Sequence, residues 1–128
     1  MKNLIYVIAL MVIVSLSSCV QEEHQKTIQF QVDMNGVENV NQVGIRGDFT
    51  DRRWQQTIPL SDENKDGIYE VSLTDTTAVY GIEFKFVLNG NDYELKDQKN
   101  REIIFEYRPE KIVYSAKFNN QEAKVTRD

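Results

Sequence analysis

The residues best suited to hold an ion lie close together at positions 62–67, in the stretch Asp62-Glu63-Asn64-Lys65-Asp66-Gly67. This stretch matches the first half of a calcium-binding loop, in which alternate side chains supply oxygen ligands. The ligands would be Asp62, Asn64 and Asp66. The full loop also needs a bidentate glutamate at its twelfth position, where this chain has Leu73. Since the same residue types also build polar turns, a weak calcium site and a simple turn both remain open.

Residue types that carry out enzyme chemistry are scarce. His24 is the only histidine and Cys19 is the only cysteine. A serine or cysteine triad needs a histidine base, and a zinc site needs several His or Cys ligands. Glu83 and Glu94 could form a carboxylate pair, but a small domain offers little cleft for a two-carboxylate glycosidase. We therefore expect that this protein is not an enzyme.

Arg46-Gly47-Asp48 spells the tripeptide that integrins read in exposed loops. Ile45 belongs to the apolar series of a predicted strand, so Arg46 should point outward as the strand ends at Gly47. An adhesion motif must project from a loop tip, and short motifs often arise by chance. We interpret the tripeptide as the end of a strand and expect that replacing Arg46 does not affect ligand binding.

Apolar and polar residues alternate with a period of two through most of the chain from Thr27, as in half-buried β-strands. Turn-forming pairs such as Asn35-Gly36 and Asn89-Gly90 separate the runs, and the second of these predicts a hairpin. No segment shows a sustained helical period. These features predict an all-β fold, an antiparallel immunoglobulin-like β-sandwich of about seven or eight strands. The sandwich should span residues 27–118, followed by a polar tail at 119–128.

The order of motifs across residues 40–105 resembles that of carbohydrate-binding modules of the glycogen- and starch-binding type. Those modules show a Gly-x-Phe-x-x-Trp turn, an Asp-Gly-x-aromatic strand, and a Tyr-x-Phe-Lys-Phe strand that ends in Asp/Asn-Gly. The corresponding stretches are Gly47-Asp48-Phe49 with Trp54, Asp66-Gly67-Ile68-Tyr69, Tyr80-Gly81-Ile82-Glu83-Phe84-Lys85-Phe86, and Asn89-Gly90. The resemblance implies the same small β-sandwich and a non-catalytic glycan-binding function, with α-glucan as the default ligand.

The resemblance also implies a set of sugar-binding residues, namely Trp54, Lys85, Tyr93, Glu94 and Asn100. Pyranose rings pack on flat aromatic side chains, while their hydroxyl groups need amide, carboxylate and ammonium partners. The chain departs from the family pattern at three places: Trp54 comes two residues late, Tyr93 replaces a second tryptophan, and the spacing from Glu94 to Asn100 is longer. The alternative is an envelope module of the same fold that docks to a protein, with Trp54 and Tyr93 serving only in packing.

Residues 1–18 are predicted to be a lipoprotein signal peptide. Lys2 precedes an apolar run, Leu4 to Leu16, that is too short to span a bilayer. The run ends in Leu16-Ser17-Ser18-Cys19, which resembles the bacterial lipobox and implies lipidation of Cys19. Residues 19–26 would then form a polar tether. We expect lipid anchoring in the bacterial cell envelope. The acidic stretch after Cys19 favours the outer membrane, and exposure at the cell surface remains open.

Composition limits the partners. The chain has 15 basic and 20 acidic residues and a net charge of −5. An acidic surface without a basic cluster argues against nucleic acid and against binding to anionic membrane surfaces. A single cysteine allows no internal disulfide, so packing must stabilise the domain.

Overall fold

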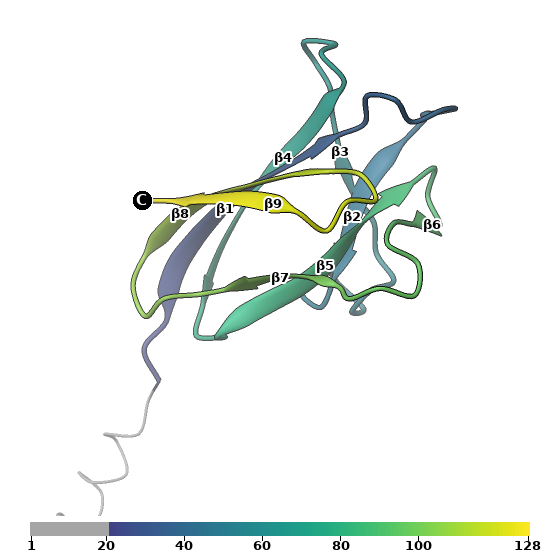
Figure 1. The fold of residues 1–128 in the computed structure, drawn as a ribbon. Helices are drawn as coiled ribbons and strands as arrows, with labels where there is room; N and C mark the ends of the chain where they lie inside the picture. Colours follow the sequence, from purple (N-terminus) through teal and green to yellow (C-terminus); the bar gives the residue numbers. More distant parts are fainter. Residues whose placement is uncertain (1–20) are drawn as a thin grey trace, which may run out of the picture.

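The computed structural model describes residues 21–128, which form two β-sheets packed face to face (Figure 1). The predicted all-β sandwich is confirmed, and this part of the chain contains no helix, so none that could cross a membrane. The signal peptide at 1–18 and the lipidation site Cys19 lie outside the described residues.

Residues 21–128 contain nine strands, rather than the expected seven or eight. They are β1 (His24–Asp33), β2 (Val43–Gly47), β3 (Ile58–Leu60), β4 (Ile68–Thr77), β5 (Gly81–Leu88), β6 (Asp92–Tyr93), β7 (Arg101–Ile104), β8 (Glu110–Lys117) and β9 (Ala123–Arg127). One sheet has the order β4-β1-β8-β9 and the other β3-β2-β5-β6, with β7 pairing beside β6 on the same edge of β5 (Figure 1). All pairs are antiparallel except β1 with β8, which is parallel. The predicted hairpin corresponds to β5 and β6.

The core follows from the alternation of side chains along each strand. In β1, Ile28, Phe30 and Val32 are buried while the intervening glutamines are only partly buried. Phe30 meets Phe84 of the opposite sheet edge to face, with ring centroids 5.0 Å apart. Tyr114 of β8 packs on Phe84 in the same way at 4.9 Å. Such aromatic contacts add to the free energy gained from apolar burial.

The N-terminal boundary differs from the predicted tether. β1 begins at His24 and includes Lys26, which is buried with only 4% of its surface exposed. The Lys26 ammonium donates to Glu110 Oε2 at 2.8 Å and to the carbonyls of Glu106 and Arg108. A buried charge is tolerated where such partners satisfy it, so residues 24–26 belong to the sandwich.

The C-terminal boundary differs as well. Residues 123–127 were expected in a polar tail, but they form β9, which pairs with β8 along its whole length. All five β9 residues are exposed, which explains why their sequence lacks an apolar pattern. Arg127 binds the Glu110 carboxylate from this strand. Burial opposes ionisation of Glu110, yet the hydrogen bonds from Lys26 and Arg127 outweigh it and hold the pKa of this carboxyl below its usual value.

Candidate functional site

Gly47 ends β2 at a point where a side chain would not fit. A Cβ atom there would lie 2.5 Å from the Glu83 carbonyl oxygen and 2.7 Å from the Phe49 ring. The next residue, Asp48, donates its backbone N–H to the Glu83 carbonyl at 3.1 Å. Its side-chain Oδ1 accepts a hydrogen bond from the Glu83 N–H at 3.2 Å. The Arg-Gly-Asp tripeptide therefore lies at the end of an inner strand that pairs with β5, and it does not project from a loop tip.

Arg46 points outward from β2, as predicted, and it is the centre of a hydrogen-bonded cluster. Its Nε donates to Thr57 Oγ1 at 2.6 Å, Nη1 to the Tyr93 hydroxyl at 2.9 Å, and Nη2 to the Gly90 carbonyl at 2.7 Å. The guanidinium also lies 5.4 Å from the centroid of the Tyr93 ring. The sequence predicts that replacing Arg46 does not affect ligand binding, whereas these contacts give Arg46 a part in fixing Thr57 and Tyr93 on this face.

Trp54 joins the cluster through its backbone. It lies in the loop between β2 and β3, is partly exposed, and has a φ of 70°. This left-handed conformation is uncommon for a bulky side chain and costs about 1–2 kcal/mol. Three hydrogen bonds hold it: the Trp54 N–H donates to the Gly47 carbonyl at 2.9 Å and to Thr50 Oγ1 at 3.3 Å, and the Tyr93 hydroxyl donates to the Trp54 carbonyl at 2.9 Å.

Lys85 occupies the same outer face, directly opposite Arg46 in the β2–β5 pairing. Its ammonium donates to the carbonyls of Leu95 at 3.0 Å and Gln98 at 3.2 Å. An ammonium has three donors, so one remains for another partner. We call the group of Arg46, Trp54, Lys85 and Tyr93 the Arg46 face.

Glu94 does not belong to this face, and its assignment as a sugar-binding residue was wrong. Its side chain points into the sandwich and is 0% exposed. Oε2 accepts hydrogen bonds from Arg101 Nε at 2.7 Å and the Phe86 N–H at 2.7 Å. Oε1 accepts from Arg101 Nη2 at 2.8 Å and the Asn119 N–H at 3.1 Å. Because side chains alternate along a strand, the outward position of Tyr93 places Glu94 inward.

Arg101 completes this buried pair. Beyond Glu94, it donates to the Tyr114 hydroxyl and to the carbonyls of Lys117 and Asn120. Burial opposes the charge on Arg101, but the hydrogen bonds and charge of Glu94 outweigh it and raise the pKa of the guanidinium. The fifth predicted residue, Asn100, is exposed just before β7, and no hydrogen bond of its side chain within residues 21–128 ties it to the Arg46 face.

The residues of the half calcium loop form a tight turn before β4. Asp62 accepts the N–H groups of Asp66 at 3.1 Å and Gly67 at 2.9 Å, and Asp66 accepts the N–H of Ile68 at 2.9 Å. The hydrogen bond from Ile68 lowers the pKa of Asp66. Asn64 donates to Asp66 at 3.2 Å. Across residues 21–128, no three His, Cys, Asp or Glu side chains gather closely enough to hold a metal ion. Calcium binding by Asp62, Asn64 and Asp66 stays a prediction.

No protein-family model matches the chain, and no curated protein matches it. Among solved structures, it is similar to the solution structure of the CBM25-2 module of the beta/alpha-amylase from Paenibacillus polymyxa. The identity is 12% and the TM-score 0.49, and the match covers 82% of this chain and 94% of that one. So few residues are shared that the function of this chain has to be argued from its own side chains.

Breaking the buried ion pair should unfold the domain more readily. Glu94→Gln and Arg101→Met should each lower the free energy of unfolding by about 3–5 kcal/mol, because each leaves a buried charge without its partner. Chemical denaturation followed by circular dichroism measures this. Asp92→Asn is the control, since it removes an exposed ion pair with Lys96 and should cost less than about 1 kcal/mol. A Glu94→Gln protein as stable as the control would mean that Glu94 has no such structural role.

Thermal melting with and without calcium shows whether residues 62–67 form a metal site or only a polar turn. If calcium binds, millimolar calcium should raise the melting temperature of the wild type, with an affinity no tighter than about 10⁻⁴ M, since the twelfth-position ligand is missing. Asp62→Ala should abolish the shift, and it should also destabilise the fold by roughly 1 kcal/mol through the lost caps. If calcium does not change the melting temperature of the wild type, residues 62–67 form a polar turn and not a calcium site.

Proposed function

We propose that this protein is a non-catalytic glycan-binding module and that the Arg46 face contacts the sugar. One observation carries the proposal: the Tyr93 hydroxyl links two partly exposed aromatic residues on one outer face, accepting from Arg46 and donating to the Trp54 carbonyl. The Tyr93 ring and the Trp54 backbone are thus held before a ligand arrives, which reduces the conformational entropy lost on binding. Backbone strain such as that of Trp54 also clusters at binding sites.

The chemistry of the face fits a sugar. The partly exposed rings of Trp54 and Tyr93 offer apolar surface for the C–H groups of a pyranose, and the remaining Lys85 donor can reach a hydroxyl. Stacking one sugar ring hides about 100 Å² of apolar surface, which corresponds to about 2.5 kcal/mol. Two such contacts, less the cost of ordering the ligand, give a dissociation constant on the order of 0.1–10 mM. The resemblance described above favours an α-glucan as the ligand.

The alternative is a protein-docking module in the cell envelope. The burial of Glu94 and the engagement of Lys85 by two carbonyls favour it, because both reduce the polar groups available to a sugar. The two functions differ in their ligand, so binding to soluble glucans distinguishes them.

Removing the aromatic contacts should weaken glucan binding. Trp54→Ala should weaken it roughly tenfold or more, since one stacking contact is lost. Tyr93→Phe should weaken it less, because the ring stays while the hydroxyl that fixes Arg46 and Trp54 is lost. Affinity electrophoresis in gels containing starch or glycogen measures the effect, with titration of maltoheptaose as a second readout.

Two variants separate a lost ligand contact from a lost fold. Trp54→Gly removes the ring but relieves the strain at a φ of 70°, so it should lose binding without losing stability. Tyr80→Ala removes an aromatic residue that is 81% exposed but lies outside the Arg46 face, and it should bind normally. Identical migration of the wild type with and without every glucan tried would contradict the sugar proposal and favour protein docking.

We further propose that Cys19 carries the lipid that anchors the domain in the bacterial envelope. The proposal is supported by the lipobox-like sequence and by the short stretch from Cys19 to the start of β1 at His24. Cells given a labelled fatty acid should incorporate it into the wild type, and the protein should partition into detergent. Cys19→Ala should lose both properties, whereas Ser17→Ala should keep them. An unlabelled, detergent-excluded wild type would contradict lipidation.

A further inference from the structure

The sandwich is open on one side, between β4 and the loop at 48–57. β4 has ten residues, whereas β3, the facing edge strand of the other sheet, has three. The two edges meet at the bridge between Ser61 and Glu70. Past this bridge toward the end of β4, the loop faces Leu73 across a hollow. The mismatch in strand length leaves apolar residues of both sheets unpaired there.

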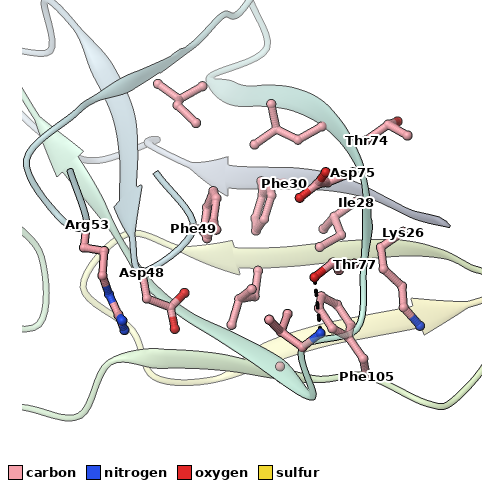
Figure 2. A pocket seen from close by; sticks show the side chains of 15 residues that line it. Lys26, Ile28, Phe30, Asp48, Phe49, Arg53, Thr74, Asp75, Thr77 and Phe105 are labelled. Carbon is pink, nitrogen blue, oxygen red and sulfur yellow. Dashed lines mark hydrogen bonds between the residues drawn. The ribbon is translucent and has the colours of Figure 1, made fainter. Parts of the chain in front are cut away.

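The hollow is apolar at its centre and has a volume of about 450 Å³. The rings of Phe30 and Phe49 lie side by side within it, 5.9 Å apart and nearly parallel (Figure 2). Leu73, Ile82 and Phe105 are among the other apolar lining residues, and the charged residues Lys26 and Asp75 line the hollow as well. Sites for small molecules typically have volumes of about 300–1,000 Å³ and mostly apolar walls, so this hollow has the size and lining of a ligand site.

A second, more polar hollow of about 720 Å³ adjoins the first. The two share six lining residues, among them Asp48, Arg53, Thr77 and Val79, so they lie side by side. Figure 2 shows Asp48 and Arg53 together on one side of the apolar centre. A ligand with an apolar part and a polar part could therefore occupy both hollows at once.

The charged residues that line the second hollow indicate which head group of a ligand would fit there. Glu83 of β5 and Glu102 of β7 are exposed and directly opposite each other in the ladder, and both line the second hollow. Like charges in this position destabilise a sheet, and a cation placed there would relieve the repulsion. Among the described lining residues of this hollow, Arg53 is the one basic side chain. Tyr80, 81% exposed, offers the face of an aromatic ring to a cation beside these carboxylates.

We propose that this side of the sandwich binds a single-chain amphiphile whose head group ends in an amine or quaternary ammonium. The apolar chain enters the hollow between the sheets, and the cationic end lies with Glu83, Glu102 and the Tyr80 ring. The site uses other residues than the Arg46 face, although Glu83 lies two positions before Lys85 on the same face of β5. An alkylammonium and a zwitterionic lipid that ends in an ammonium share this chemistry.

Photolabelling of the full chain in a nonionic amphipol tests the site. Four probes carry the same twelve-carbon chain with a photoreactive diazirine, and their heads are trimethylammonium, phosphocholine, carboxylate and maltoside. Mass spectrometry should find adducts of the first two on peptides containing Phe49, Leu73 or Phe105, and excess dodecyltrimethylammonium should suppress them. Stronger labelling by trimethylammonium than by phosphocholine would identify a simple alkylammonium as the better ligand, and the reverse order a zwitterionic lipid.

Matched variants separate the chain site from the head-group site. Leu73→Trp fills the apolar hollow and should reduce labelling by all probes roughly tenfold. Glu83→Gln with Glu102→Gln should reduce labelling by the cationic probe about threefold. Glu122→Gln, in the exposed turn before β9, changes one charge far from the hollow and should have no effect. Melting curves confirm that each variant is folded.

Two results would overturn the proposal. Adducts spread over the chain, or unchanged in Leu73→Trp, would show that the hollow takes no apolar chain. Equal or stronger labelling by the carboxylate or maltoside probe would show that the head group is not cationic.

Discussion

The buried ion pair of Glu94 and Arg101 is the constraint on which the rest of the structure depends. Both side chains are fully buried, so every polar atom needs a partner inside the protein. These partners come from β5, β8 and the turn after β8, which locks one end of the two sheets together. The pair also closes the segment 94–101, whose carbonyls hold Lys85 on the outside. The outer face is therefore positioned by an interaction that lies on the opposite side of the sheet.

A second buried pair lies at the other end of the sandwich. Lys26 and Glu110 face each other in the parallel pairing of β1 with β8, and Arg127 adds a third charge from β9. Between the two pairs the core is apolar and aromatic. Charged pairs of this kind seldom add much net stability compared with apolar residues, but leaving one partner alone is costly. Their arrangement favours one strand register, because a shift would leave a buried charge without a partner.

Much of the fold could be predicted from the alternation of residues, since that pattern depends on local geometry. The same alternation could also have predicted that two charged residues are buried. Lys26 continues the inward series of Ile28 and Phe30, and Arg101 shares the inward parity of Ile103. The Arg46 face could not be predicted as a whole, because it joins residues 47 positions apart through tertiary contacts. The parallel direction of β8 was equally hidden, since alternation is the same in both directions.

The position of β1 between β4 and β8 determines when the domain can fold. The first strand of the sandwich is an inner strand of its sheet, and its parallel partner lies more than 80 residues later, at the pairing of Lys26 with Glu110. Contacts that span so much of the chain require large loops to close before they stabilise anything, which slows folding. As the chain emerges from the ribosome, β1 can pair with β4 first, but its other edge has no partner until β8 has been synthesised. That edge of β1 therefore stays accessible to chaperones through most of synthesis.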